Sequence, residues 1–289
     1  MRPTPPAIAV LLATLVGCGS IEEPPQEQAV TLFEEVATQV GIRFEHQASE
    51  GQYYIVEEMG PGGALLDADG DGDLDLYLVQ GGRIPDTEIG EPAPNRFYRN
   101  LGDGTFRDDT EASGAGDTSY GLAAAAADVD TDGDTDLYLT NIGPDVRLIH
   151  NGQGRIEDRT QAAGLGDDGF GAGSAFADFD GDGLLDLYLT VYMPWSPDVE
   201  RPCRDRTGAP EYCNPTHYPS GQDRIYRNRG DGTFEDLTAQ PGIDDPPSLG
   251  LGGVTADFDG DGRIDIYVAN DHTPNYLWMN QGGFRFTEE

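Results

Sequence analysis

The sequence predicts an all-β protein, a β-propeller built of four-stranded blades, and three observations predict it. A nine-residue phrase, Asp-x-Asp-x-Asp-Gly-x-x-Asp, occurs four times, and an apolar-Tyr-apolar triplet follows each copy. A second phrase after each triplet has the pattern of a strand, a Gly-containing tight turn and another strand. The 289 residues include 40 Gly and 20 Pro, which favours short strands and turns over helices. We therefore expect an incomplete ring of about four blades.

The nine-residue phrase has the carboxylate spacing of a calcium-binding loop. Calcium takes about six to eight oxygen ligands, and a short loop can supply them from carboxylates at positions 1, 3, 5 and 9 and a backbone carbonyl at position 7. The expected carboxylate ligands are Asp67, Asp69, Asp71, Asp75, Asp128, Asp130, Asp132, Asp136, Asp178, Asp180, Asp182, Asp186, Asp257, Asp259, Asp261 and Asp265. The expected carbonyl ligands are those of Asp73, Asp134, Leu184 and Arg263. We therefore expect about four bound Ca²⁺ ions.

Two other interpretations of the loops are an EF-hand and an acidic turn without metal. Position 6 is Gly in every copy, as a sharp bend with positive φ requires. An EF-hand would have Glu at position 12 and continue into a helix, but this position is Leu78, Leu139, Leu189 or Val268 in a short β-prone segment. A solvated acidic turn without metal would leave up to five crowded carboxylates repelling one another. A calcium loop that runs into a strand fits best.

The repeating unit is longer than the loop. A β-prone segment precedes the loops, for example Ala123–Ala127 and Gly173–Ala177, and the second phrase adds two more strands after the triplet. Each unit therefore has four strands, with the calcium loop between the first two. The loops at 67–75, 128–136, 178–186 and 257–265 start 50 to 79 residues apart, a spacing typical of propeller blades.

The N-terminal residues are expected to lie outside this fold. An apolar run from Ala7 to Val16 follows Arg2, and it is too short to span a bilayer but long enough for a signal-peptide core. It ends in Leu-Val-Gly-Cys18, which resembles the lipobox of bacterial lipoproteins. The resemblance implies a signal peptide over residues 1–17, lipidation of Cys18 and export to the outer membrane, facing the periplasm or the cell surface. An ordinary secretory peptide with an incidental Cys is the alternative. Residues 18–30 form a Glu- and Pro-rich tether, and the partial propeller occupies residues 31–289.

The other two cysteines lie in a Pro-containing insert over residues 194–222. If Cys18 carries a lipid, Cys203 and Cys213 remain as a pair in an oxidising compartment, and we expect a disulfide between them. A zinc site that also uses His217 is the alternative, but it lacks a fourth ligand.

The charge restricts the partners of this chain. The formal net charge is −36, and four divalent ions would offset only a small part of it. Nucleic acid is excluded as a partner, because its phosphates require Lys and Arg. We expect a protein or glycan ligand, and contact with a membrane only through the N-terminal lipid.

The repeated phrases resemble those of a known family. The aspartate loops with Leu-Tyr-Leu, the phrase Tyr-Arg-Asn-x-Gly-Asp-Gly-Thr-Phe and the cysteine insert are similar to the FG-GAP/VCBS repeats of bacterial proteins related to cartilage acidic protein. The resemblance covers about residues 31–289. It implies a propeller like the head of integrin α subunits, with calcium in the blade loops, and an additional C-terminal ASPIC/UnbV module.

The two ends of the chain depart from the family pattern. Phe33–Ala37 resembles the end-of-blade segment Phe106–Thr110, so the chain is expected to open with an unpartnered outer strand, to close within the same segment at Phe286, and to be the N-terminal part of a longer product. No catalytic constellation stands out, and we expect no catalytic residues and no further cofactor. The expected function is a calcium-stabilised binding or adhesion scaffold rather than an enzyme. A calcium-assisted polysaccharide lyase is the alternative.

Overall fold

The computed structural model describes residues 33–47, 51–150, 155–165, 169–239 and 247–289. The chain forms two compact units, Met1–Val36 and Ala37–Glu289. The expected signal peptide, the lipidation site Cys18 and the tether lie outside the described residues. Within the described ranges, no helix combines the length and the apolar character that crossing a bilayer requires.

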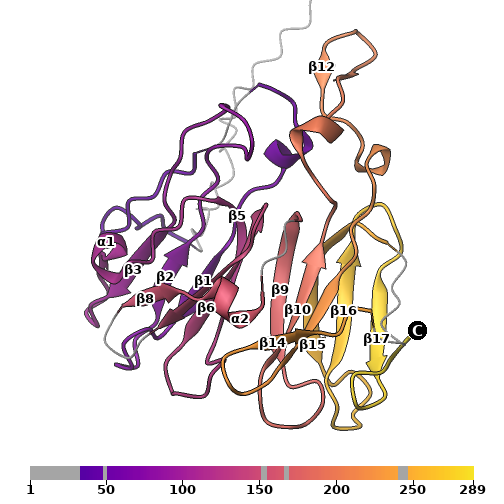
Figure 1. The fold of residues 1–289 in the computed structure, drawn as a ribbon. Coiled ribbons are helices and arrows are strands. Elements are labelled where there is room, and N and C mark those ends of the chain that lie inside the picture. The colour runs from indigo at the N-terminus through magenta and orange to yellow at the C-terminus, as the bar shows by residue number, and fades with distance from the viewer. Residues whose placement is uncertain (1–32, 48–50, 151–154, 166–168, 240–246) are drawn as a thin grey trace, which may run out of the picture. The chain divides into compact units, whose positions relative to one another are not determined.

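The second unit contains four antiparallel four-stranded sheets, and Figure 1 shows them in chain order from indigo to yellow. Blade 1 contains β1 (Gly63–Leu66), β2 (Asp75–Leu78), β3 (Arg96–Asn100) and β4 (Phe106–Asp108). Blade 2 contains β5 (Tyr120–Ala127), β6 (Asp136–Ile142), β7 (Val146–His150) and β8 (Ile156–Asp158). Blade 3 contains β9 (Gly171–Ala177), β10 (Asp186–Val191), β13 (Arg224–Asn228) and β14 (Phe234–Asp236). Blade 4 contains β15 (Gly250–Ala256), β16 (Asp265–Asn270), β17 (Tyr276–Asn280) and β18 (Phe286–Glu288). The predicted all-β fold of four propeller blades is confirmed.

The blades pack in sequence through their first strands. β1 lies beside β5, β5 beside β9, and β9 beside β15. The triplet after each aspartate loop supplies the apolar contact, because its Tyr and its two flanking residues point to opposite faces of the sheet. Tyr77 lies in one buried cluster with Leu137 and Leu139, Tyr138 in another with Leu187 and Leu189, and Tyr188 in a third with Ile266 and Val268. Blades 1 to 3 thus bury their Tyr together with residues of the next blade, and full burial of a large apolar side chain is worth about 1.5–3 kcal/mol.

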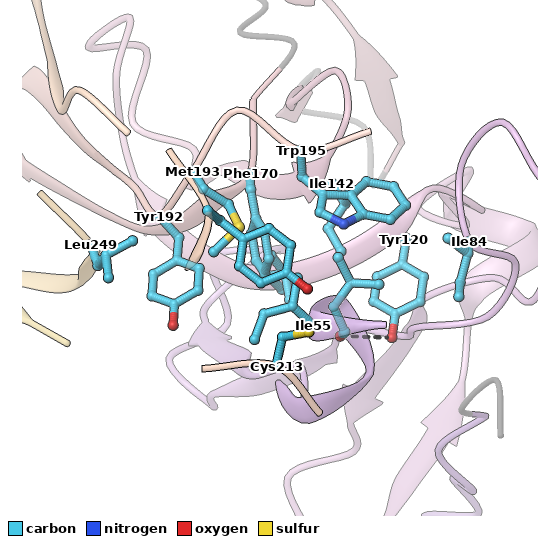
Figure 2. Packing of buried hydrophobic residues seen from close by; sticks show 13 residues of the cluster. Ile55, Ile84, Tyr120, Ile142, Phe170, Tyr192, Met193, Trp195, Cys213 and Leu249 are labelled. Atoms are coloured by element: carbon cyan, nitrogen blue, oxygen red, sulfur yellow. Dashed lines mark hydrogen bonds between the residues drawn. The ribbon is translucent and has the colours of Figure 1, made fainter. Parts of the chain in front are cut away.

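A separate cluster of buried residues joins the short helix η1 (Ile55–Glu58) to the insert, and Figure 2 shows its aromatic rings gathered around Ile55 and Cys213. Glu200 holds the two segments together. Its carboxylate accepts hydrogen bonds from Ile55 N at 3.1 Å, from Trp195 Nε1 at 2.6 Å and from the Tyr218 hydroxyl at 2.9 Å. The insert therefore folds against the blade ends instead of forming a long free loop.

The insert interrupts blade 3 between β10 and β13. It contains η2 (Pro197–Val199), the two-stranded hairpin of β11 (Cys203–Arg204) and β12 (Pro210–Glu211), and η3 (Pro215–His217). The expected disulfide between Cys203 and Cys213 is present, with the two Cα atoms 5.2 Å apart. His217 lies close to both sulfurs, but sulfurs bonded to each other are not available as thiolate ligands, which disfavours the zinc alternative.

Two short helices also interrupt the β structure, α1 (Thr110–Ser113) after blade 1 and α2 (Thr160–Ala163) after blade 2. The expectation of an outer strand over Phe33–Ala37 is wrong. Residues 33–36 have no strand structure, and the Phe33 side chain is 90% exposed. The chain instead makes a turn closed by Ile42 N donating to Ala37 O at 2.8 Å. This segment resembles an end-of-blade phrase but does not form a strand, because a strand forms only where a neighbouring strand supplies the ladder of hydrogen bonds.

Candidate metal centres in the four hairpin loops

Each aspartate loop connects the first and second strands of its blade, as the sequence predicts. Position 6 has positive φ in all four loops, at 89° in Gly72, 96° in Gly133, 90° in Gly183 and 89° in Gly262. Position 4 is also left-handed, which the sequence analysis did not predict. Its φ is 72° in Gly70, 60° in Thr131, 79° in Gly181 and 81° in Gly260. Three of the four loops place Gly at this position, so the signal was present in the sequence, whereas Thr131 adopts it against its β-branched side chain.

The carboxylate at position 1 organises the backbone of its loop. In loop 3 the Asp178 carboxylate accepts N–H groups from Gly181 at 2.7 Å, Asp182 at 3.1 Å and Gly183 at 2.9 Å. Asp67 and Asp257 accept the same three donors in their own loops. The Gly262 N–H and its neighbours hold the pKa of Asp257 below its ordinary value. The backbone therefore stabilises a negative charge at position 1.

Position 5 shapes the second half of the loop. Its carboxylate accepts the N–H of position 7 in every copy, which closes an Asx turn. The four bonds are Asp73 N to Asp71 at 2.9 Å, Asp134 N to Asp132 at 2.9 Å, Leu184 N to Asp182 at 3.0 Å and Arg263 N to Asp261 at 2.9 Å. Any residue can supply this backbone group, which explains why position 7 varies from Asp to Leu to Arg.

The carboxylate at position 9 is buried, and it ties the loop to the third strand of the same blade. Asp186 is fully buried and accepts an N–H from Phe179, at position 2, and another from Asn228, on β13, both at 2.9 Å. Asp75 and Asp265 make the matching pair of bonds. Burial raises the pKa of Asp186 to about 7 despite these two donors, and it also raises the pKa of Asp75. Position 9 is thus a structural lock as well as a candidate ligand.

The loops bring several carboxylates of each set together. Positions 1 and 3 lie in one group in every loop, with ligand atoms within 4.8 Å of one another. Position 5 completes the group in loops 1 and 2, through Asp71 and Asp132. Position 9 completes it in loops 3 and 4, through Asp186 and Asp265. All of these donors are hard carboxylate oxygens, the type that Ca²⁺ and Mg²⁺ prefer.

One atom of loop 2 provides a direct test of whether the site fits a cation. Asp128 Oδ1 is buried and has no hydrogen-bond partner among the described residues. A buried carboxylate oxygen without a partner is costly, because its charge has lost the hydration that it has in water. A cation between positions 1 and 3 would compensate it, so the residues present fit a hard divalent metal.

Among the side chains that the structure describes, arginines on the third strand of the blade reach two of the loops. Arg227 Nη2 lies 2.6 Å from Asp180 and 3.1 Å from Asp182, at positions 3 and 5 of loop 3. Arg99 contacts Asp69 in loop 1 in the same way, and its Nε lies 3.0 Å from Asp109. The strand register places Ile149 and Met279 at this position in blades 2 and 4. In loop 4, Arg263 pairs with Asp261 from within the loop.

The Asn of the Tyr-Arg-Asn phrase has a role that the sequence alone did not indicate. In blade 3, Asn228 Nδ2 donates to Leu185 O at 3.0 Å and, across the blade boundary, to Val129 O in loop 2 at 2.7 Å. In blade 4, Asn280 Nδ2 donates to Ile264 O at 2.9 Å and to Phe179 O in loop 3 at 2.8 Å. This Asn therefore links its own loop to the loop of the preceding blade.

A second polar lock involves the Tyr of each triplet and was also missed. Its hydroxyl forms a hydrogen bond with the side chain of the residue directly before the third strand of the blade. That side chain also accepts a backbone N–H from the second strand or from within two residues of its end, namely that of Gln80, Asn141, Val191 or Asn270. The four pairs are Tyr77 with Asn95, Tyr138 with Asp145, Tyr188 with Asp223, and Tyr267 with Asn275. In blade 3, Val191 N also donates to Asp223 at 2.8 Å. Burial raises the pKa of Asp223 to about 6. Asn and Asp both accept the N–H, which is why the sequence varies here.

The repeat that the loops define matches a known family model. The model for the FG-GAP-like repeat matches residues 67–139, 128–189, 208–268 and 257–289, which is more than half of the chain. The chain belongs to the FG-GAP-like repeat family. Human cartilage acidic protein 1 is 40% identical over 72 residues, and these cover 24% of this chain and 11% of that protein. The Xenopus tropicalis protein is 39% identical over 66 residues, 22% of this chain and 10% of that protein. The FG-GAP-like chain thus spans about a tenth of the length of the relatives it matches.

The solved structures to which this chain is similar are more distant. An Agrocybe aegerita lectin that recognises non-reducing terminal N-acetylglucosamine is 20% identical, with a TM-score of 0.40 over 78% of this chain and 51% of that chain. The V. cholerae biofilm matrix protein Bap1 is 18% identical, with a TM-score of 0.39 over 79% of this chain and 30% of that chain. TM-scores this low do not establish a shared arrangement of blades.

Proposed function

We propose that this FG-GAP-like protein is a calcium-binding, lipid-anchored β-propeller outside the cytoplasm, and that it acts as a scaffold that binds a protein or glycan rather than as an enzyme. The observation that carries the proposal is the fourfold gathering of carboxylates at the same corner of each blade. A single acidic turn has many explanations. Four equivalent loops, each with positions 1 and 3 converging, support a common ligand.

The residues that would hold calcium are the carboxylates at positions 1, 3, 5 and 9, with the carbonyl of position 7. Bound calcium would neutralise the clustered charge and fix the hairpin between the first two strands of the blade. The same carboxylates also shape the loop through hydrogen bonds within the chain. Position 1 orders the loop backbone, position 5 closes the Asx turn, and position 9 fastens the loop to the third strand. Because the loops are pre-shaped by hydrogen bonds, little ordering remains to oppose binding.

Net charge supports the same proposal. The formal charge of −36 opposes compaction by self-repulsion. Two charges 4 Å apart in a surface environment interact by up to about 4 kcal/mol, so several uncompensated carboxylates in one loop work against folding. Divalent cations at the loops would relieve the repulsion where it is strongest.

The decisive experiment measures metal content and stability together. Protein purified in calcium is dialysed against a chelator, and its melting temperature is compared with that of the calcium-loaded sample. We expect a large fall on chelation and recovery when calcium, but not sodium, is restored. Asp182→Ala should remove one ion per chain by elemental analysis. Asp198→Ala is the control, because this exposed Asp lies in η2, away from the loops. An unchanged melting temperature after verified metal removal would refute the proposal.

The scaffold and the anchor have separate tests. Cys18→Ser should release the protein from the membrane fraction, and continued retention would contradict the lipid anchor. A screen against glycans and acidic polysaccharides in calcium buffer addresses the ligand. Binding without product release supports the scaffold, whereas release of unsaturated sugar fragments would favour the polysaccharide lyase instead.

A further inference from the structure

A cavity lies between blades 1 and 2, at the strand ends opposite the aspartate loops. Tyr120 begins β5 and pairs with Ile142 at the end of β6, whereas loop 2 joins the other ends of these two strands. The segment between β2 and β3 of blade 1 forms the rest of the wall. The cavity has a volume of about 290 Å³, and its apolar lining consists of Ile84, Pro85, Pro92, Tyr120, Ile142 and Pro144. It shares no residue with the candidate metal centres.

The size and the lining of this cavity suit one apolar side chain. Ligand sites usually measure about 300–1,000 Å³, so a cavity at the lower end of that range takes a single side chain or ring and not an extended ligand. Isoleucine and proline side chains supply most of the wall, and they form no hydrogen bonds. A sugar would bring several hydroxyl groups that such a wall cannot pair, and burying unpaired polar groups is costly. The lining therefore favours an apolar side chain over a sugar.

One polar atom at the cavity lacks a partner. Arg83 lines the cavity, and its Nε is buried without a hydrogen-bond partner among the described residues. Arg83 Nη1 lies 3.7 Å from the exposed carboxylate of Glu88, and this pair does not involve Nε. A buried donor without an acceptor costs free energy, which an incoming oxygen atom would recover. We therefore expect the ligand to carry a hydrogen-bond acceptor beside its apolar group.

Acidic side chains around the cavity restrict the kind of acceptor. Asp86 lines the cavity, and Glu88 and Glu91 are exposed on the same segment between β2 and β3. Arg83 is the single basic residue of that segment, so a ligand carboxylate would meet more negative than positive charge. A neutral backbone carbonyl avoids this repulsion, and basic residues beside it would be attracted. A segment of a protein supplies the apolar side chain, the carbonyl and the flanking positive charges together.

Hydrogen bonds within the segment between β2 and β3 shape the wall before a ligand binds. Ile84 is fully buried, and its N–H donates to Ile89 O at 2.9 Å. The Thr87 hydroxyl donates to Ile84 O at 2.8 Å and accepts the N–H of Ile89 at 3.0 Å. Asp86 has a φ of 57°, a left-handed conformation that Asp and Asn adopt more readily than most residues. A preformed wall reduces the ordering that would oppose binding.

We propose that this cavity is the docking site for a basic segment of a partner protein. One apolar side chain of the segment fills the cavity, and a neighbouring backbone carbonyl accepts a hydrogen bond from Arg83 Nε. Flanking Lys or Arg residues of the segment lie near Asp86 and Glu88. The inference rests on the proposed scaffold function, because it names the class of partner and the surface that binds it. It does not depend on calcium in the aspartate loops.

The test is an NMR titration of the isotope-labelled full chain carrying Cys18→Ser, in calcium buffer. The probes are amidated peptides of the sequence acetyl-Gly-Arg-X-Arg-Gly, in which X is Leu, Phe or Trp. We expect at least one of these peptides to bind. Affinity should fall about tenfold or more when X is Ser, because the buried apolar side chain is lost. Replacing both Arg residues of the peptide by Glu should also weaken binding, and added salt should weaken the Arg peptides.

Three variants of the chain locate the binding. Thr118→Trp introduces a large side chain from an exposed position on the cavity and should abolish binding. Arg83→Met keeps an unbranched apolar stem but removes the Nε donor, and it should lower affinity about tenfold. Asp86→Asn keeps a residue suited to the left-handed conformation but removes the charge, so it should reduce the salt dependence. Thr38→Trp and Asp198→Asn are the matched controls, since both positions are exposed and neither lines the cavity. Circular dichroism checks that every variant is folded.

The outcomes separate this inference from the proposed function. If none of the peptides binds, or if binding survives Thr118→Trp, the docking site is refuted, whereas metal content and the glycan screen still judge the calcium-binding scaffold. A glycan whose binding Thr118→Trp abolishes would also refute the peptide site, and it would support the scaffold. Peptide binding that responds to all three variants in a chain shown to hold no calcium would support the docking site while the calcium proposal fails.

Discussion

Loops 2 and 3 have the same aspartates at positions 1, 3, 5 and 9, yet the structure supports them differently. In loop 3, Gly181 takes the left-handed conformation at position 4, and Arg227 lies against Asp180 and Asp182. In loop 2, Thr131 occupies position 4, and the register places uncharged Ile149 where blade 3 has its arginine.

The carboxylate at position 1 shows the consequence of this difference. Both oxygens of Asp178 accept backbone N–H groups, whereas Asp128 Oδ1 is buried without a hydrogen bond among the described residues. Loop 3 thus compensates much of its negative charge with groups of its own chain. Loop 2 leaves one oxygen at position 1, Asp128 Oδ1, for which a bound cation would be the compensating group. The same ligand pattern can therefore correspond to different degrees of metal dependence.

Position 9 is what the two loops share, and its loss should have the largest effect. Asp186→Ala would leave the buried N–H groups of Phe179 and Asn228 without an acceptor, and each unsatisfied group costs about 1–3 kcal/mol. We expect a loss of about 3 kcal/mol or more in the free energy of unfolding by urea denaturation in calcium. Asp136→Ala in loop 2 should cost a similar amount, and Asp198→Ala should cost less than about 0.5 kcal/mol. A small effect in either loop would mean that position 9 serves the metal and not the fold.

The next prediction compares blade 3 with blade 1 at the Tyr lock. Blade 3 has Asp223 where blade 1 has Asn95, and burial raises the pKa of Asp223 to about 6. A carboxyl whose pKa is higher in the folded than in the unfolded state binds its proton more tightly when folded. The folded protein therefore loses stability as the pH rises from about 4, the pKa of this carboxyl in the unfolded chain, through about 6, its pKa in the folded chain.

Asp223→Asn removes this titration while keeping an acceptor for Val191 N and adding a donor toward the Tyr188 hydroxyl, as in blade 1. We expect the variant to be more stable than the parent by about 3 kcal/mol above pH 7, because the shift is about two pKa units and one unit corresponds to about 1.4 kcal/mol. The advantage should disappear near pH 4. Denaturation at a series of pH values, with the calcium concentration held constant, measures it. A difference that does not vary with pH would show that Asp223 is not the titrating group.

Arg227→Ala should remove a cation from loop 3 and so increase the stabilisation that calcium gives this loop, as we expect for loop 2. The ion pairs with Asp180 and Asp182 are partly exposed, so their loss should cost no more than about 1 kcal/mol in the chelated protein. Calcium should then stabilise the variant more than it stabilises the parent, since the arginine no longer competes for the same oxygens. Melting temperatures with and without calcium give both quantities. Arg229→Ala is the control, because it removes an exposed pair between the residue after β13 and Glu235 on β14 of the same blade. Equal calcium stabilisation of variant and parent would contradict the interpretation.

The sequence predicted the parts of this molecule that depend on neighbours in the chain. The aspartate spacing, the Gly at position 6 and the strand after each loop are local, and each follows from the conformation of a few consecutive residues. The cysteine pair could be predicted from the sequence for the same reason, because Cys203 and Cys213 are only ten positions apart in the chain. The packing of blades followed from repetition of one unit.

The locks could not be predicted because they join distant residues. Asn228 meets Val129 across 99 positions, and Tyr188 meets Asp223 across 35. Nothing local to Asn228 reveals that its amide bonds two different loops. The misplaced strand at Phe33–Ala37 has the converse cause, since its composition suits a strand but the strand needs a partner that the fold does not supply there.

The smallest expected effect concerns position 4, and it tests whether the comparison of loops 2 and 3 extends to the backbone. Thr131 has a φ of 60°, and a left-handed conformation costs a residue with a Cβ about 1–2 kcal/mol. Thr131→Gly removes that cost but adds conformational freedom to the unfolded chain, so the net gain should be only about 0.5 kcal/mol. Gly181→Thr in loop 3 is the reciprocal change and should destabilise by more, because it adds the strain that Thr131 already bears. Urea denaturation in calcium measures both variants. If the two substitutions shift stability in the same direction, the loops do not share this backbone conformation in solution. The side chain at position 4 then does not account for the difference between the two loops.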